Sequence, residues 1–331
     1  MSNDDTTKSD INYSDIKAVN NTGGEALQYR ISGNTRVCGL IGHPVGHTLS
    51  PDIHNFLAKQ TGIDLVYVPF EVMPGTVKAA VEGAYDLNIL GLNVTVPHKI
   101  EVIDALKDID PEAKAIGAVN TLVRTEGGYK GYNTDHIGLK RALSAEGVDL
   151  HNNKLVVLGA GGAARSAAFL GAFSGASDIY VLNRNYDRAV ALCRDVNDYA
   201  VCNGLESESE SDKLCKPLRL EDYSLIDGDE LIVIQASSVG MVPNQDAVII
   251  EDEEFYERMQ FGFDVVYKPG VTRFMQLATK HGKKNVCGLT MLLYQGIAAY
   301  ELWNGITVDT KTANDCLCEL KKALGPVEET R

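Results

Sequence analysis

One stretch of the sequence decides the fold: Lys154-Leu155-Val156-Val157-Leu158-Gly159-Ala160-Gly161-Gly162-Ala163-Ala164-Arg165. Its first residues form a short apolar run, which is typical of a buried strand, and a turn of small residues follows at once. The chain then continues in small residues, so the pattern predicts a strand, a tight turn and a helix. The spacing Gly159-x-Gly161-x-x-Ala164 fits the dinucleotide-binding fingerprint, in which the third small residue can be Ala.

Each residue type in this turn has a physical reason. Gly159 allows the tight turn after the strand, and Gly161 removes a Cβ so that backbone N–H groups can approach a pyrophosphate. The helix N-terminus supplies unsatisfied donors and partial positive charge. The alternative is a Gly-rich turn that binds nothing, but the strand before it and the helix after it favour a cofactor site. The residues expected to contact the cofactor are Gly159, Ala160, Gly161, Gly162 and Ala163.

The end of the next expected strand, 178–182, indicates which dinucleotide binds. An acidic residue there would grip the ribose 2′-hydroxyl of NAD. The sequence instead has Asn183-Arg184-Asn185, with Arg188 one helical turn later. Two guanidiniums suit a 2′-phosphate because Arg offers fork-like donors to phosphate oxygens, so this stretch favours NADP. Asp187 is the counter-signal: it either repels a phosphate or serves as an ordinary acid in the first turn of a helix.

Strand-like and helix-like segments alternate on both sides of this stretch. Ser50-Pro51-Asp52 is typical of a helix start, with Ser50 as the N-cap and Pro51 at the first helical position. The β/α alternation predicts a mainly parallel sheet in the first half of the chain. The expected strands are 37–41, 65–70, 91–96, 154–158, 178–182, 231–234 and 261–266, and helical patterns cover 75–86, 133–147 and 291–324.

Length and charge limit the possible functions. The 331 residues suggest about two domains, and 45 acidic against 31 basic residues give a net charge of −14. Nucleic acid and anionic membranes need a basic surface, so neither is expected as the main partner. The seven cysteines are scattered without a CxxC pair, so we expect no metal site. We see no signal peptide and no run of 18 apolar residues, and expect a cytoplasmic protein.

Two polar segments are expected to lie outside the packed core. Residues 1–24 are rich in Asn, Asp, Ser and Thr, which predicts a disordered leader. Residues 206–212 alternate Glu or Asp with Ser, which is typical of a solvated loop between elements.

A second group of chemically active residues lies in Asn93-Val94-Thr95-Val96-Pro97-His98-Lys99. On a strand, Asn93 and Thr95 point to the same side, and polar groups on a buried strand need a partner. Lys99 would follow the carboxyl end of that strand, where α/β sheets bind ligands. The alternative is a surface lysine after a proline turn.

A third group adds an amide and a carboxylate. Asn120 lies in Gly117-Ala118-Val119-Asn120-Thr121, and Asp135 lies in Tyr132-Asn133-Thr134-Asp135. The Asn-Thr-Asp context also suits an ordinary helix cap. Spacing alone does not show whether Asp135 reaches Lys99.

Together these motifs resemble the shikimate dehydrogenase family, the NADP-linked enzymes that reduce 3-dehydroshikimate. The resemblance covers about residues 25–325, with the matching strings in family order. These strings are His47-Thr48-Leu49-Ser50-Pro51, Asn93 to Lys99, Gly117 to Thr121, Asn133-Thr134-Asp135, Gly159 to Ala163, Asn183-Arg184, Asp264-Val265-Val266-Tyr267 and Met291-Leu292-Leu293-Tyr294-Gln295.

The resemblance implies a discontinuous α/β substrate domain at 25–134 and 288–331, with a Rossmann-like NADP-binding domain at 135–287 inserted into it. It implies a small-molecule substrate and a place in aromatic amino acid (chorismate) biosynthesis. The implied roles are a catalytic pair, Lys99 and Asp135; hydroxyls for the substrate carboxylate, Thr48, Ser50 and Tyr267; ring-hydroxyl partners, Asn93, Thr95, Asn120 and Gln295; and nicotinamide neighbours, Gly288 and Met291.

Departures from the family pattern leave alternatives open. The usual Ser-x-Ser is Thr48-x-Ser50, which leaves shikimate against quinate preference open. The usual Asn-Ala-Thr is Gln235-Ala236-Ser237, and the Thr that follows Asn-Arg is Asn185. One alternative is a quinate/shikimate dehydrogenase that uses NAD, and another is a non-catalytic, dinucleotide-sensing regulator. Family members occur as monomers and homodimers, so either state fits.

Overall fold

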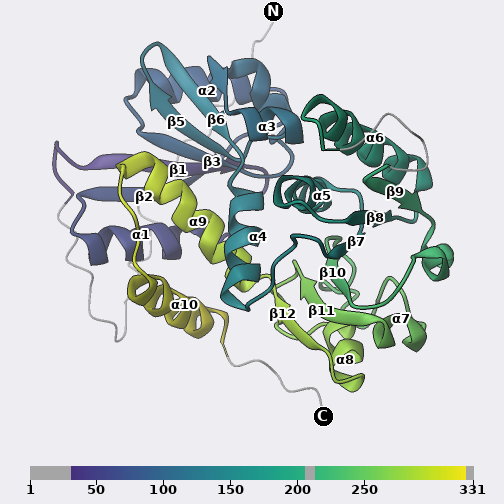
Figure 1. Ribbon diagram of the computed structural model, residues 1–331. Helices are drawn as coiled ribbons and strands as arrows, with labels where there is room; N and C mark the ends of the chain where they lie inside the picture. The colour runs from purple at the N-terminus through teal and green to yellow at the C-terminus, as the bar shows by residue number, and fades with distance from the viewer. Residues whose placement is uncertain (1–30, 206–212, 326–331) are drawn as a thin grey trace, which may run out of the picture. The chain divides into compact units, whose positions relative to one another are not determined.

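The computed structural model describes residues 31–205 and 213–325, so the predicted leader at 1–24 and the predicted loop at 206–212 lie outside the described residues. From Thr35 onward the described residues form one compact unit. It contains two six-stranded sheets with helices packed against them (Figure 1). The α/β class predicted from the sequence is therefore confirmed.

The first sheet is mixed, with more parallel than antiparallel pairings. Its strands are β1 (Arg36–Gly42), β2 (Leu65–Glu71), β3 (Gly91–Val94), β4 (Asp108–Ile109), β5 (Thr121–Thr125) and β6 (Gly128–Tyr132), in the spatial order β2-β1-β3-β5-β6-β4. β1 pairs in parallel with β2 and β3, but β5 runs antiparallel to β3 and β6. β4 pairs in parallel with β6, so three of the five strand pairings are parallel, as the β/α alternation predicts. The antiparallel β5–β6 pairing comes from a two-residue hairpin loop, Glu126 and Gly127, with Gly127 at φ 75°.

The second sheet is parallel throughout. Its strands are β7 (Lys154–Leu158), β8 (Asp178–Leu182), β9 (Cys215–Leu218), β10 (Leu231–Gln235), β11 (Met259–Asp264) and β12 (Lys284–Cys287), in the order β12-β11-β10-β7-β8-β9. β7 has β8 on one side and β10 on the other, which makes it the switch point where such sheets bind ligands. The strand expected at 261–266 ends at Asp264, which leaves Val265 and Val266 in the following loop.

Ten α-helices are present in the described residues. They are α1 (Ser50–Thr61), α2 (Val77–Asp86), α3 (Pro111–Ile116), α4 (Thr134–Ala145), α5 (Gly162–Ser174), α6 (Tyr186–Cys202), α7 (Glu253–Glu257), α8 (Arg273–Lys280), α9 (Leu289–Asn304) and α10 (Thr310–Leu324), with short 3-10 helices at Glu101–Ala105 and Leu220–Leu225. Two predictions are wrong in detail. Ser50 is the first helical residue, because Leu49 occupies the N-cap position. The helix expected over 291–324 breaks at Gly305, which takes the left-handed conformation at φ 63°.

Small residues let α5 lie close to the second sheet. Ala164, Ala167 and Ala168 are fully buried and belong to the same apolar cluster as Leu155 of β7. A Cβ at Gly171 would come within 2.7 Å of the Leu155 side chain. The close packing fixes the N-terminus of α5 directly beyond the end of β7, where the fingerprint places a pyrophosphate.

A glycine also brings α4 and α9 together, and Figure 1 shows these helices side by side. A Cβ at Gly138 of α4 would come within 2.7 Å of the Gln295 backbone nitrogen and 2.8 Å of the Met291 carbonyl oxygen in α9. Only glycine allows this backbone approach without displacing a helix. The approach places Asp135, in the first turn of α4, and Gln295 around the same cavity.

Candidate active site

A cavity of about 390 Å³ lies at the carboxyl ends of strands from both sheets. The structure brings together all nine side chains predicted for catalysis and substrate binding, together with three of the predicted cofactor neighbours. The predicted residues that line the cavity are Thr48, Ser50, Asn93, Thr95, Lys99, Asn120, Asp135, Tyr267, Gln295, Ala163, Gly288 and Met291. Residues 36 positions apart in the sequence, such as Lys99 and Asp135, therefore meet in one site.

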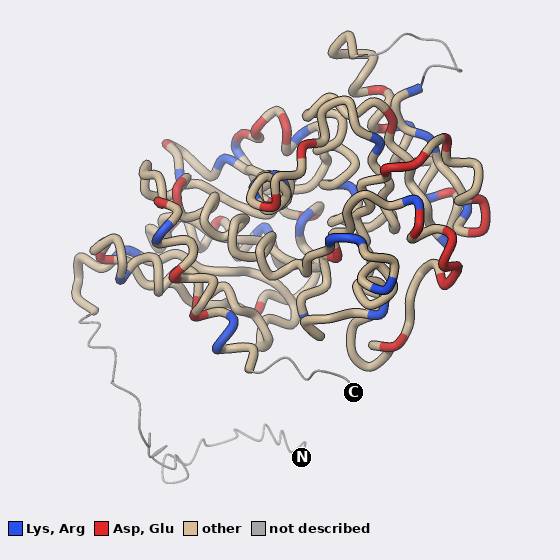
Figure 2. The backbone as a smooth tube through the Cα atoms, turned by 60° about the horizontal axis from the view of Figure 1, so that its bottom comes forward, with Lys and Arg blue, Asp and Glu red and all other residues tan. Residues whose placement is uncertain are grey.

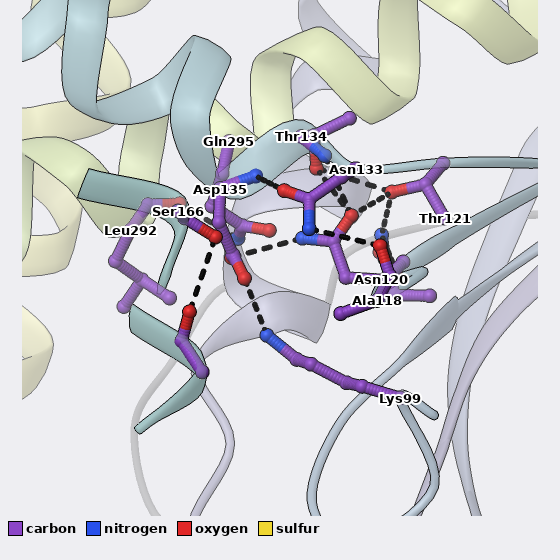
Figure 3. Close-up of polar contacts among 12 residues, drawn as sticks. Lys99, Ala118, Asn120, Thr121, Asn133, Thr134, Asp135, Ser166, Leu292 and Gln295 are labelled. Atoms are coloured by element: carbon purple, nitrogen blue, oxygen red, sulfur yellow. Dashed lines mark hydrogen bonds and ion pairs between the residues drawn. The ribbon is translucent and has the colours of Figure 1, made fainter. Parts of the chain in front are cut away.

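Lys99 and Asp135 form a direct ion pair inside the cavity (Figure 3). The Lys99 Nζ donates to Asp135 Oδ2 at 2.6 Å, and the two side chains are 24% and 12% exposed. The pair is thus shielded from bulk water but still open to a ligand, which strengthens its electrostatic effect on a bound group. The alternative of a surface lysine after a proline turn is wrong.

Asp135 is held from a second side by Asn120. The Asn120 Nδ2 donates to Asp135 Oδ1 at 2.9 Å, while the Asn120 Oδ1 accepts from the Thr134 backbone nitrogen at 2.7 Å (Figure 3). The N-cap of α4 is Asn133, whose side-chain oxygen accepts from the Asp135 backbone nitrogen. Because Asn133 caps the helix, the Asp135 carboxylate is not needed as the cap and accepts from Lys99.

The turn that carries Lys99 is fixed by its neighbours. β3 ends at Val94, so Thr95 lies just beyond the strand rather than on it. The His98 side chain is fully buried, and its Nε2 lies 2.7 Å from the Val72 carbonyl oxygen. The Lys99 carbonyl oxygen accepts from the Val119 backbone nitrogen at 2.8 Å. These contacts fix the Lys99 backbone, so only its flexible side chain needs to adjust to a ligand.

Sequence reasoning missed two residues behind the cavity. The Tyr67 hydroxyl donates to Asn93 Oδ1 at 2.8 Å, and the His54 ring stacks on Tyr67 with 4.2 Å between centroids. Burial lowers the pKa of His54 to about 3, so this ring is neutral at physiological pH. Tyr67 orients the Asn93 amide, whose Nδ2 donates to Thr121 Oγ1 at 3.1 Å. The usable signal is the inward position of Tyr67 on β2, because a buried tyrosine hydroxyl needs a partner.

Three further hydroxyls line the cavity. The Thr48 Oγ1 donates to Ser50 Oγ at 3.1 Å, and Tyr267 enters from the loop after β11. Burial raises the pKa of Tyr267, so its phenol stays protonated and can donate to an anion. His47 also lines this part, is exposed, and was assigned no role in the sequence analysis.

The α9 side of the cavity is tightly packed. A Cβ at Gly288 would come within 2.0 Å of the Val265 carbonyl oxygen, so the α9 N-terminus can approach the loop after β11 only with glycine. The Gln295 Nε2 donates to the Leu292 carbonyl oxygen of the same helix at 2.9 Å. A Gln amide nitrogen carries two hydrogens, so Gln295 can keep this hydrogen bond and donate its second hydrogen to a ligand.

The predicted cofactor turn has the geometry of the fingerprint but lies outside the cavity, apart from Ala163. Gly159 takes φ 122°, and a Cβ at Gly161 or Gly162 would meet nothing within 4 Å. No side chain caps the N-terminus of α5. Open space over uncapped backbone amides is the arrangement that a pyrophosphate needs, so the residues fit a dinucleotide.

The predicted 2′-phosphate residues lie at the end of β8. Arg184, Asn185 and Arg188 are exposed. The Asn185 side-chain oxygen caps α6 by accepting from the Arg188 backbone nitrogen at 3.3 Å. Asp187 lies in the first turn of α6, where an acidic residue stabilises a helix.

Within residues 31–205 and 213–325, no group of three or more His, Cys, Asp or Glu could hold a metal ion. No helix in the same part of the chain is both long and apolar enough to cross a membrane.

Comparison with known proteins identifies the family of the chain. The family model described as "Shikimate dehydrogenase substrate binding domain" matches residues 40–122, and that described as "Shikimate 5'-dehydrogenase C-terminal domain" matches 288–314. The chain is 40% identical over 290 residues to the shikimate dehydrogenase (NADP(+)) of Desulforamulus reducens, across 87% of this chain and 96% of that protein. It is 39% identical over 296 residues to that of Methanopyrus kandleri, across 89% and 99%.

Solved structures give the same result. A crystal structure of shikimate dehydrogenase in complex with NADP+ matches with a TM-score of 0.77 at 36% identity, across 88% of this chain and 97% of that chain. The Listeria monocytogenes enzyme in complex with shikimate and NAD matches with a TM-score of 0.78 at 32% identity, across 87% and 98%. A fingerprint turn beside a polar cavity with a lysine–aspartate pair defines a dinucleotide-dependent α/β dehydrogenase. The chain belongs to the shikimate dehydrogenase family, which confirms the resemblance noted in the sequence.

Proposed function

We propose that the protein catalyses the reversible, NADPH-dependent reduction of 3-dehydroshikimate to shikimate. The observation that carries this proposal is the single cavity in which Lys99 and Asp135 face the hydroxyl and amide groups expected to hold the substrate. The relatives named shikimate dehydrogenase (NADP(+)) support the same reaction and cofactor.

Lys99 provides the proton in this reaction. Reduction adds a hydride to the carbonyl carbon, which is the chemistry that bound NADPH supplies. The carbonyl oxygen then gains negative charge and needs both a proton and positive potential. The Lys99 ammonium can supply both, and Asp135 orients it from 2.6 Å. Asn120 in turn orients Asp135, with one amide hydrogen left for a substrate hydroxyl.

The substrate would be held by neutral groups. Thr48, Ser50 and Tyr267 would donate to its carboxylate, and four other polar residues would bind its ring hydroxyls. These ring-hydroxyl partners are Asn93, Thr95, Asn120 and Gln295. Neutral donors suit a single carboxylate in a chain of net charge −14, because they do not require a large positive field.

The cofactor would lie along the end of the second sheet, with its pyrophosphate at the N-terminus of α5, its 2′-phosphate near Arg184 and Arg188, and its nicotinamide near Gly288 and Met291.

We divide the chain into a substrate domain at 25–134 and 288–331 and a cofactor domain at 135–287, which agrees with the separation of the two sheets. We further propose a cytoplasmic enzyme that acts as a monomer or homodimer, to be resolved by size-exclusion chromatography with light scattering.

A four-way assay tests the proposed function. Purified protein is given shikimate or quinate with NADP+ or NAD+, and reduced cofactor is followed by absorbance. We expect the highest kcat/KM with shikimate and NADP+. Preference for NAD+ is the specific alternative, because the Listeria relative is described in complex with shikimate and NAD. Cofactor binding without turnover would support the sensing regulator instead.

A further inference from the structure

Three arginines near one edge of the second sheet form no ion pair with any carboxylate of residues 31–205 and 213–325, in a protein with a net charge of −14. Figure 2 shows acidic residues on many segments of the backbone, and five of the ten described arginines form an ion pair with a carboxylate. Those that form such ion pairs are Arg141, Arg165, Arg194, Arg258 and Arg273. Within residues 31–205 and 213–325, Arg184, Arg188 and Arg219 form none. Arg36 and Arg124 also form no ion pair with a described carboxylate. Each donates a hydrogen bond instead, Arg36 to a side-chain oxygen of α9 and Arg124 to a carbonyl oxygen in the first half of the chain.

Strand register brings Arg219 to the same edge as the predicted 2′-phosphate residues. Leu182 of β8 pairs with Leu218 of β9, and the two strands are parallel. Asn183 and Arg219 are therefore the first residues beyond two paired strand ends, which are about 5 Å apart in a sheet. Arg219 was not predicted as a cofactor residue, because 36 residues separate it from Asn183 in the sequence.

A contact with an aromatic ring orients the Arg219 side chain. Its guanidinium carbon lies 4.9 Å from the centre of the Tyr186 ring, and Tyr186 is the first residue of α6. A cation over an aromatic face is attracted by the ring and loses part of its freedom before any ligand binds. The guanidinium is thus held at the N-terminus of a 17-residue helix, where the helix dipole also favours an anion.

We propose that Arg219 is a third guanidinium of the cofactor 2′-phosphate site and strengthens the choice of NADP over NAD. The inference rests on the proposed function, because it takes NADP as the ligand of this edge. A phosphate monoester carries nearly two negative charges at neutral pH. A third guanidinium therefore adds to the binding free energy that the first two arginines provide.

The test separates the 2′-phosphate from the rest of the cofactor. Isothermal titration measures the binding of adenosine 2′,5′-bisphosphate and of adenosine 5′-monophosphate to the wild-type protein and to Arg219→Gln. We expect Arg219→Gln to weaken the bisphosphate about tenfold, as the loss of one charge-assisted contact predicts, and to change the monophosphate less than twofold. The matched control is Arg194→Gln, an exposed arginine later in α6, which should change neither affinity.

The kinetic readout is the KM for each cofactor. Arg219→Gln should raise the KM for NADP+ about tenfold, leave the KM for NAD+ and both kcat values within twofold, and lose its effect in high salt. Arg219→Lys should recover part of the affinity. Equal losses for both nucleotides, or no loss of bisphosphate affinity, would overturn the proposal. If the titration succeeds but shikimate is not turned over, the proposed function fails and the Arg219 assignment stands.

Discussion

Two carboxylates lie at or behind the same cavity, Asp135 in α4 and Asp264 at the end of β11, and their surroundings differ. Asp135 has a cation at 2.6 Å and remains partly exposed. Asp264 is fully buried and accepts only from neutral donors: Thr272 Oγ1 at 2.6 Å, the Val266 backbone nitrogen at 2.9 Å and Gln235 Nε2 at 3.1 Å. Burial outweighs these hydrogen bonds and raises the pKa of Asp264 to about 6.

The difference in surroundings indicates that the two carboxylates have different roles. Asp135 holds a group that meets the substrate, whereas Asp264 holds a loop that carries such a group. The Asp264 network joins the loop after β10 to the loop after β11, which carries Tyr267 into the cavity. Loss of the charge on Asp135 should therefore change the reaction, and loss of the charge on Asp264 should change stability with pH.

The largest effect is expected at Lys99. This lysine pairs with Asp135, whereas Asp264 accepts from neutral donors. Lys99→Ala removes the proton donor, so kcat should fall by a factor on the order of 10²–10⁴. Stopped-flow or steady-state rates with shikimate and NADP+ measure this loss. The Kd for NADP+ should change little, because Lys99 lies in the first sheet's half of the cavity. Near-normal turnover would remove Lys99 from the catalytic role.

Asp135→Asn should cost less than loss of Lys99. The amide keeps the size of the side chain but removes the charge that orients the ammonium, so kcat should fall by a factor of roughly 10². The variant should remain folded, which circular dichroism and thermal unfolding can check. A rise in KM with an unchanged kcat would instead make Asp135 a substrate-binding group.

Gly138→Ala tests whether the α4–α9 contact positions Asp135. The added Cβ would meet the Gln295 backbone nitrogen at 2.7 Å, so the helices must separate. We expect a loss of about 1–3 kcal/mol in the free energy of unfolding and a lower kcat/KM. Gly83→Ala in α2 is the matched control, because its Cβ would meet nothing within 4 Å. A stable, fully active Gly138→Ala variant would contradict the account of this contact.

The smallest effect is expected at Asp264. Its pKa rises from 3.8 to about 6 on folding, so the stability linked to its protonation is present below pH 4 and is lost as the pH rises through about 6. Asp264→Asn lacks this dependence. Relative to wild type, the variant should gain stability between about pH 4 and pH 7 in urea unfolding. A difference in stability that does not vary with pH would contradict the buried carboxylate.

Much of the site could be predicted from local sequence. The fingerprint turn, the polar residues around β3 and the family strings placed nine side chains that line one cavity. The sequence could not show that Lys99 touches Asp135, since their contact depends on how α4 meets the turn after β3. Tyr67 and Arg219 were missed because their partners lie on other elements. The β5–β6 hairpin was missed because short strands around Gly127 give a weak apolar pattern.

A double-mutant cycle for Lys99 and Asp135 tests the central claim most directly. The measurement compares kcat/KM for shikimate in wild type, Lys99→Ala, Asp135→Asn and the double variant, with NADP+ held saturating. If Asp135 acts through Lys99, the double variant should lose no more activity than Lys99→Ala alone, which is the non-additivity expected of residues that work as a unit. Losses that multiply, as for independent residues, would contradict the account.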